Sequence, residues 1–214
     1  CVIDRVERLG ATVILYIVGA PQAQHLEMVG VVSRKAGWVP ETTQMVHVAF
    51  GNVLGADRKI LKSRSGEVVK LDALLTESVE RAREAVREKN PDWSDAQHNS
   101  IAQQVGIGAI KYADLSTDRI KDYVFDWERM LSFDGNTSPY LQYAHARICS
   151  IFRKAGVDRA SVRGVTPLVE HEAERALVLR LLQFDTAVLD TLDKYSPHRL
   201  CTYLYDLASE FSAF

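Results

Sequence analysis

The sequence predicts an α/β region that is followed by an all-α region. Helix and strand patterns alternate over the first 50 residues, which is the rhythm of a doubly wound parallel sheet. From Leu71 onward the spacing of apolar residues becomes helical, and no further strand is predicted. The chain has 214 residues, of which 47% are hydrophobic and 25% are charged, so its composition is that of a globular protein and excludes disorder as the default.

The α/β region begins with a short amphipathic helix that stops at Gly10, a residue suited to a helix end. The segment Thr12–Val18 is continuously apolar and rich in β-branched residues, which predicts a buried strand of a parallel sheet. A second helix follows the turn at Gly19 and ends near Gly37, and Met45–Phe50 forms the second strand. Ligands bind at the carboxyl ends of parallel strands, so the loops after both strands are candidate sites.

The all-α region starts with two long helix patterns. An apolar stripe with helical spacing begins at Leu71 and stops before Asn90, which a proline follows. Ser94 and Gln97 have the spacing of a capping box at the start of the next helix. The segment 120–133 is interpreted as a further helix with a polar opposite face.

Later helix starts are predicted where Ser or Thr precedes Pro, because the hydroxyl caps the helix and Pro suits its first turn. These pairs are Ser138-Pro139, Thr166-Pro167 and Ser196-Pro197. Gly156 is expected to close the first of these helices. The segment 135–138 is predicted to be a loop that serves as a hinge between helical layers.

Charge and cysteine content narrow the class of protein. The 26 basic and 28 acidic residues give a formal charge of −2, so the whole chain carries no sign of a nucleic-acid partner. The three cysteines are far apart and lack zinc-ligand spacing, which predicts neither a disulfide framework nor a metal site and favours a reduced, cytosolic compartment. Apolar runs fall short of the roughly 20 residues that span a bilayer, so no membrane span is predicted.

One segment is locally basic. Residues Asp57–Lys70 carry a net charge of +3 and are bracketed by Gly55 and Gly66. A glycine-hinged basic loop that follows a strand can close over a triphosphate and stabilise charge that develops when the α-phosphate is attacked. Charge alone leaves a second interpretation open, in which the segment is a solvated surface loop.

Two histidines lie near the expected strand ends. His25 stands beside Gln22 and Gln24 in the first strand-end loop, where several polar side chains converge on an expected pocket. His47 belongs to the second strand. Taken alone, each histidine is also compatible with a structural role in which its ring nitrogen satisfies a local hydrogen bond.

A second basic stretch follows the Ser138-Pro139 helix start. Tyr140, Tyr143 and Arg147 share one side of that helix, which suits either an RNA-contacting face or a packing stripe. Five basic residues against one acid give the stretch a net charge of +4: Arg147, Arg153, Lys154, Arg159 and Arg163 against Asp158.

Four motifs resemble those of arginyl-tRNA synthetases in their order and spacing. They are LYIVGAPQAQH from Leu15, HVAFGNVLG from His47, KSRSGEVVKL from Lys62 and SPYLQYAHAR from Ser138. The resemblance is strong from about Val6 to Ala155 and weaker through the last helices.

The resemblance implies a class I enzyme that activates arginine with ATP as arginyl-adenylate and transfers it to tRNA. The implied fold is the second half of a Rossmann-like parallel sheet in residues 1–66, a helical connection in 67–138 and part of a helical-bundle anticodon-binding domain in 139–214. The implied partners are ATP with Mg²⁺, L-arginine and tRNA(Arg) in the cytoplasm, with neither DNA nor a membrane among them.

The resemblance also implies roles for individual residues. The arginine pocket is expected to include Tyr16, Gln22 and His25. Adenine is expected to meet His47, Phe50, Gly51 and Val53, partly through backbone groups. In the signature loop, Lys62 and Arg64 are the expected phosphate ligands, with Lys59 as a substitute. The tRNA is expected to contact Tyr140, Tyr143, Arg147, Arg153 and Arg159.

Two departures from the family pattern qualify this interpretation. The signature loop Lys59–Ser65 is degenerate, so no single catalytic lysine is assigned. The other class I signature, a His-x-Gly-His-type turn, is absent and is expected upstream of Cys1, so the chain is interpreted as a segment that is inactive by itself. Two alternatives stay open: a synthetase-like paralogue that binds RNA or a partner without catalysis, and an ATP-using enzyme of another pathway that has lost tRNA charging.

Overall fold

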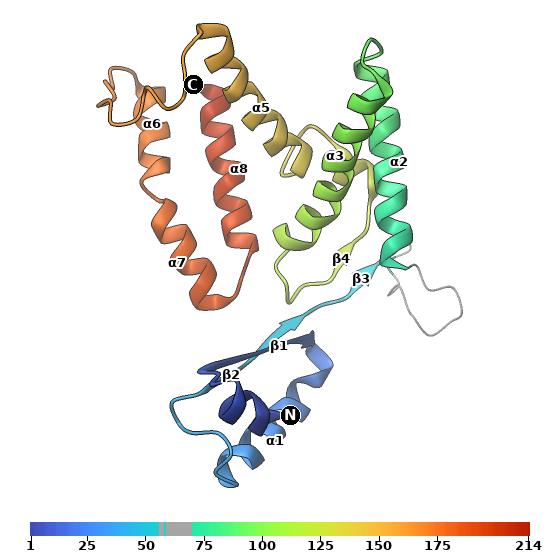
Figure 1. Cartoon of the computed structure of the whole chain (residues 1–214), viewed down its shortest axis with the longest axis vertical. Coiled ribbons are helices and arrows are strands. Elements are labelled where there is room, and N and C mark those ends of the chain that lie inside the picture. Colours follow the sequence, from blue (N-terminus) through green and yellow to red (C-terminus); the bar gives the residue numbers. More distant parts are fainter. Residues whose placement is uncertain (56–57, 59–69) are drawn as a thin grey trace. The chain divides into compact units, whose positions relative to one another are not determined.

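A computed structural model of the chain describes residues 1–55, 58 and 70–214 (Figure 1). These residues form two compact units. The first comprises the described residues up to Arg58 together with Arg119–Val124, and the second comprises those from Lys70 to Asp118 together with Phe125–Phe214. The predicted order of an α/β region and then a helical region is confirmed.

The first unit is built on two parallel strands. β1 (Val13–Gly19) and β2 (Gln44–Phe50) pair along their whole length, so that Gly19 lies opposite Phe50 at the carboxyl end. One turn of π-helix (Asp4–Arg8) precedes β1, and α1 (Ala23–Lys35) joins the two strands. A helix of this kind is the crossover that a parallel pair needs.

One face of β1 is more open than the sequence predicts. Val13, Leu15 and Ile17 are 44%, 42% and 66% exposed, whereas Ile14 on the other face is 5% exposed. The prediction of a fully buried strand is therefore wrong for β1. Neighbouring side chains of a strand point to opposite faces, and a continuous apolar run does not reveal whether both faces are covered.

The first unit also contains a short second sheet. β3 (Val53–Leu54) pairs in parallel with β4 (Tyr123–Val124), although the two strands are about 70 residues apart in sequence. The predicted helix over 120–133 is confirmed only over α4 (Trp127–Leu131) of the second unit, and it is wrong over the residues before α4, where the structure has β4. A two-residue strand shows no apolar period, and its pairing partner is distant, so local sequence carried no signal for it.

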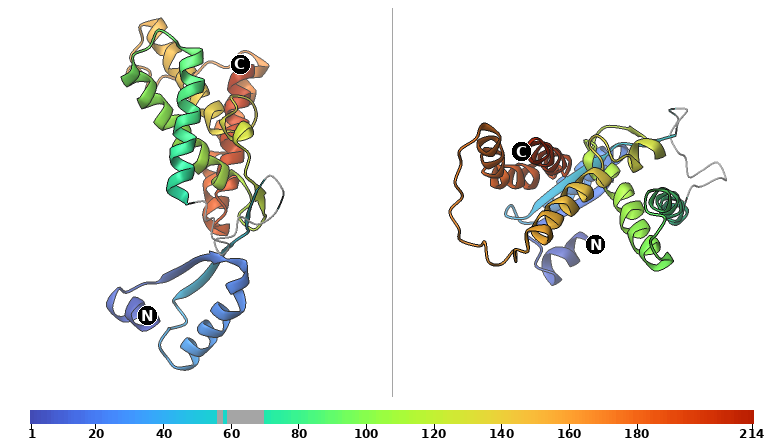
Figure 2. Two further views of the ribbon diagram at one scale, coloured as in Figure 1. Left: turned by 90° about the vertical axis from the view of Figure 1, so that its right-hand side faces the viewer. Right: turned by 90° about the horizontal axis from the view of Figure 1, so that it is seen from above.

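Two long helices pack against each other in the second unit. α2 (Leu71–Lys89) and α3 (Asp95–Ser116) lie side by side in Figure 2, with Ala82 and Ala102 in the core between them. Both predicted helices are confirmed, as is the capping box that Ser94 forms. The two helices approach closely at Gly106, because this residue has no side chain to separate its backbone from that of α2. At this point the Ser78 hydroxyl donates to the Gly106 carbonyl oxygen at 2.8 Å.

Replacing Gly106 by Ala is expected to destabilise the second unit by about 1–3 kcal/mol, the usual cost of overpacking. A Cβ atom built at Gly106 would lie 2.7 Å from the Ser78 carbonyl oxygen, which belongs to backbone and cannot move aside cheaply. Gly30→Ala in α1 is the matched control, because a Cβ there has no neighbour within 4 Å. We expect Gly30→Ala to be neutral or stabilising by about 0.4–1 kcal/mol. Urea unfolding followed by circular dichroism measures both, and equal effects would contradict the packing argument.

The remaining helices of the second unit are α5 (Ser138–Ala155), α6 (Glu172–Leu181), α7 (Phe184–Lys194) and α8 (His198–Ala213). α8 packs against α5, α6 and α7. The helix starts predicted at Ser138 and Ser196 are confirmed to within two residues, although Thr137 is the residue that caps α5. Gly156 ends α5 with a φ of 66°, as predicted.

The helix start predicted at Thr166-Pro167 is wrong. This pair lies in the exposed connection between α5 and α6, which loops away from the helices in the right-hand view of Figure 2. α6 begins five residues later at Glu172, where the Glu174 carboxylate accepts hydrogen bonds from the backbone N–H groups of Glu170 and His171. These bonds hold the pKa of Glu174 below its usual value. A Thr-Pro pair suits an extended connection as well as a helix start, so it does not identify one alone.

Within the described residues, the structure has no helix whose length and apolar character would let it cross a membrane.

Candidate functional site

Three predicted site residues follow one another in sequence from the middle of β1 into the first turn of α1. Tyr16 belongs to β1, Gln22 ends the 3₁₀-helix Ala20–Gln22 that follows it, and His25 lies in the first turn of α1. Gln22 and His25 are exposed, whereas Tyr16 is half-buried. The strand therefore supplies a fixed residue, and the turn supplies two residues that face solvent.

Tyr16 and His47 lie opposite each other in the parallel register and so share one face of the sheet. His47 Nε2 lies 3.0 Å from the Val18 carbonyl oxygen, which can only accept, so this nitrogen carries the proton. The Tyr16 hydroxyl accepts from Arg5 at 3.2 Å, and the guanidinium carbon of Arg5 lies 5.4 Å from the centre of the Tyr16 ring. Both rings are thus held in place by neighbouring groups.

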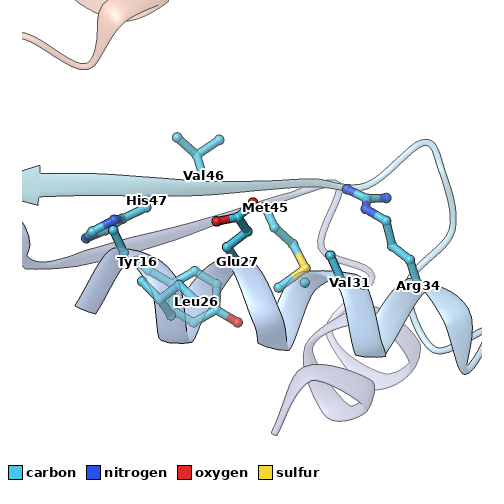
Figure 3. A pocket seen from close by; sticks show the side chains of 10 residues that line it. Tyr16, Leu26, Glu27, Val31, Arg34, Met45, Val46 and His47 are labelled. Carbon is cyan, nitrogen blue, oxygen red and sulfur yellow. The ribbon is translucent and has the colours of Figure 1, made fainter. Parts of the chain in front are cut away.

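A pocket of about 400 Å³ opens between α1 and the sheet (Figure 3). Tyr16 points from β1 toward Leu26 of α1 and Met45 points from β2 toward the same helix, while Val46 points away from it. Among the polar lining residues, Arg34 donates to the carbonyl oxygens of Pro40 and Thr43 and so holds the connection from α1 to β2. The pocket includes Tyr16 and His47 but not Gln22 or His25, so the structure brings together only part of the predicted set.

The segment after β2 is held by residues from far along the chain. Phe50 is 45% exposed at the strand end. The Gly51 N–H donates to the Arg119 carbonyl oxygen at 2.7 Å, and a Cβ atom at Gly51 would lie 2.6 Å from the Lys121 carbonyl oxygen. Only glycine fits this approach, so its place in the motif has a packing cause. Val53 pairs with Tyr123.

Two residues that hold this segment were missed by sequence reasoning. Arg119 donates to the Ala49 carbonyl oxygen at 2.6 Å, and Asp122 accepts from the backbone N–H and the side-chain amide of Asn52. Nothing in the local sequence marks either residue, because their partners lie about 70 positions earlier. A strand predicted at residues 123–124 could have pointed to both residues, but the sequence pattern predicts none there.

The predicted phosphate ligands Lys59, Lys62 and Arg64 lie outside the described residues. Arg58 is described, is exposed and has a φ of 58°. Its N–H donates to the Gly55 carbonyl oxygen at 2.8 Å.

The predicted tRNA-contacting residues divide into two groups. The Tyr140 ring packs against Tyr205 of α8 with centroids 5.5 Å apart, and its hydroxyl lies 3.4 Å from the Ser209 hydroxyl, so this residue joins α5 to α8. Tyr143 is 60% exposed. The three arginines Arg147, Arg153 and Arg159 are exposed as well.

Comparisons with known proteins identify two families along the chain. Residues 1–127 match the family described as tRNA synthetases class I (R), catalytic domain, and residues 141–214 match the DALR anticodon binding domain. An arginine–tRNA ligase of Thermobifida fusca is 55% identical over 210 residues, which are 98% of this chain and 36% of that protein. One from Erwinia tasmaniensis is 49% identical over 214 residues, which are 100% of this chain and 37% of that protein.

Solved structures give the same result. The crystal structure of arginyl-tRNA synthetase from Plasmodium falciparum superposes with a TM-score of 0.85 at 29% identity, over 99% of this chain and 36% of that one. Arginyl-tRNA synthetase of Thermus thermophilus gives a TM-score of 0.77 at 36% identity, over 93% of this chain and 32% of that one. The chain therefore spans little more than a third of the length of the curated relatives named above.

Proposed function

The chain belongs to the class I tRNA synthetase (R) family, and from that premise we propose that it supplies the second half of the nucleotide-binding fold and part of the tRNA-binding region of an arginyl-tRNA synthetase. The observation that carries the proposal is the order of the two matches: a catalytic-domain family over residues 1–127 is followed by an anticodon-domain family over residues 141–214 of the same chain. Because the relatives are nearly three times as long, the chain would act within a longer polypeptide.

In the proposed reaction a carboxylate oxygen of arginine attacks the α-phosphate of ATP, and pyrophosphate leaves. A ribose hydroxyl at the 3′ end of tRNA(Arg) then attacks the carbonyl carbon of the adenylate, and AMP leaves. The protein's contribution is to orient the reactants and stabilise the charge that develops on the phosphate. We place the reaction in the cytoplasm, in keeping with the three cysteines, which are all free.

We propose roles for the described residues that the resemblance to arginyl-tRNA synthetases implies. Tyr16, Gln22 and His25 are proposed to meet arginine at the end of β1. His47, Phe50, Gly51 and Val53 are proposed to border adenine at the end of β2. Since the Gly51 N–H is already bonded to Arg119, Gly51 would contribute its small size and not its donor.

The triphosphate is proposed to meet Lys62 and Arg64, with Lys59 as a substitute. Mg²⁺ is proposed to enter with the triphosphate, because this ion is commonly held by substrate phosphates and one or two carboxylates. The proposed domain boundaries are residues 1–66 for the nucleotide-binding part, 67–138 for the helical connection and 139–214 for the anticodon-binding part.

The proposal is tested by arginine-dependent exchange of pyrophosphate into ATP. We expect exchange from the full-length protein that contains this chain and background exchange from the 214-residue chain alone, because charge stabilisation needs all donors around one phosphate. Exchange by the isolated chain would mean that the active site is misplaced. A full-length protein that binds tRNA(Arg) but performs no exchange would favour the non-catalytic paralogue.

A further inference from the structure

Six residues between two helices of the second unit belong to the first unit. Arg119–Val124 follows α3 and precedes α4 in sequence, yet it lies beside residues 49–54 at the end of β2. We call Arg119–Val124 the clasp. Its contacts fall on the stretch that the proposed function assigns to adenine.

The clasp forms hydrogen bonds with Ala49, Gly51 and Asn52 of that stretch. The Arg119 side chain donates to the Ala49 carbonyl oxygen at 2.6 Å, and the Gly51 N–H donates to the Arg119 carbonyl oxygen at 2.7 Å. The Tyr123 N–H donates to the Asn52 carbonyl oxygen at 3.1 Å. Asp122 Oδ1 accepts from the Asn52 backbone N–H at 2.5 Å and from its side-chain Nδ2 at 3.0 Å.

These bonds satisfy backbone N–H groups that have no partner in the β1–β2 sheet. β2 ends at Phe50 and β3 starts at Val53, so the N–H groups of Gly51 and Asn52 lie between two ladders. Backbone donors at such a break must find other acceptors or water. The clasp supplies the acceptor for each of these two N–H groups: the Arg119 carbonyl oxygen for Gly51 and the Asp122 carboxylate for Asn52. The bonds to Asp122 are of the stronger, charge-assisted kind.

We propose that Asp122 and Arg119 are positioning residues for ATP, which act through Asn52, Gly51 and Ala49 without touching the nucleotide. This inference rests on the proposed function, because it takes the end of β2 to be the adenine side of the site. With Asp122 in place, the backbone after Phe50 is held in one conformation before ATP arrives. Without it, ATP must order the segment on binding, which lowers affinity for ATP and not for arginine.

The test uses the full-length protein, with pyrophosphate exchange and direct ATP binding by calorimetry as readouts. We expect Asp122→Ala to raise the KM and Kd for ATP about tenfold, the scale of one hydrogen bond to a charged group. The kcat and the KM for arginine should stay within about twofold, since the phosphate-binding groups are unchanged. Asp122→Asn should recover most of the loss, because its amide oxygen can still accept from Asn52.

Lys121→Ala is the matched control in the same clasp, since it removes an exposed side chain and keeps the backbone. Equal ATP constants for Asp122→Ala and Lys121→Ala would overturn the inference while wild-type exchange upholds the proposed function. A parallel loss of kcat and of both KM values would also overturn it, as the sign of a general structural role. If Asp122→Ala fails to fold, Arg119→Met decides the matter: we expect it to raise the KM and Kd for ATP and to leave the KM for arginine within about twofold, because it removes the donor to the Ala49 carbonyl oxygen, and unchanged ATP constants would overturn the inference. A wild-type protein that binds no ATP would overturn both proposals together.

Discussion

Lys62→Ala and Arg64→Ala, each made in the full-length protein, are expected to slow arginyl-adenylate formation by about 10²–10³-fold, the scale of one charge-stabilising donor. Charge moves onto the α-phosphate and the departing pyrophosphate as the bond breaks. A cation aimed at that charge lowers the barrier more than it strengthens ground-state binding, so kcat should fall while the KM for arginine changes little. Single-turnover formation of the adenylate measures the step directly.

Lys70→Ala is a suitable control for these variants, because it removes one positive charge from the same basic segment at an exposed position just before α2. We expect it to stay within about threefold of wild type, since a screened surface charge has a small effect. Lys59→Ala should have a smaller effect than either main variant if Lys59 is a substitute. Normal turnover in both Lys62→Ala and Arg64→Ala would favour the alternative interpretation, a solvated surface loop.

The double charge reversal Arg153→Glu with Arg159→Glu is expected to weaken tRNA(Arg) binding about 10–100-fold and to flatten its salt dependence. Each phosphate contact adds roughly 0.7–0.9 to the magnitude of the slope of log affinity against log salt, so two lost contacts should lower that magnitude by about 1.4–1.8. Arg153 lies in the last turn of α5, and Arg159 follows in the exposed connection, with its guanidinium 3.8 Å from Cys149 Sγ. ATP binding should be unaffected, as neither residue is proposed to meet the nucleotide.

Fluorescence titration of tRNA at several salt concentrations measures both the affinity and the slope. Lys111→Glu with Arg175→Glu reverses the same number of exposed charges in the second unit outside the basic stretch. If both double variants weaken binding equally, the effect is one of overall charge. If Arg153→Glu with Arg159→Glu leaves affinity and slope unchanged, the basic stretch is solvated surface and the tRNA contacts lie elsewhere.

The sequence predicts those parts of the fold whose causes are local. The parallel pairing of the first two strands follows from β-branched apolar runs separated by a helix. The start of α3 follows from the side-chain bonds of Ser94 and Gln97, and the end of α5 from the left-handed conformation that Gly156 adopts. In each case the residues that cause the feature lie within a few positions of it.

The features of the fold that the sequence predicts wrongly depend on residues far away in the chain. β4 exists because Tyr123 and Val124 pair with a strand 70 residues away, and no window of local sequence contains both partners. The exposure of Ile17 depends on which layers cover the sheet, which an apolar run does not reveal. The candidate site shows the same division: Tyr16 and His47, which the sequence motifs singled out, pair with each other in the sheet, whereas Arg119 and Asp122 are identified only from their hydrogen bonds to residues 70 positions earlier.

The pairing of β3 with β4 sets an order for folding during synthesis. α2 and α3 pack against each other and are joined by a short connection, so the pair can form as soon as the chain has been made to about Ser116. The first unit, in contrast, includes residues on both sides of this helical pair and cannot complete its second sheet until Val124 has left the ribosome. The segment that begins the chain therefore finishes folding after helices that are made later, and the end of β2 stays without its clasp during that interval.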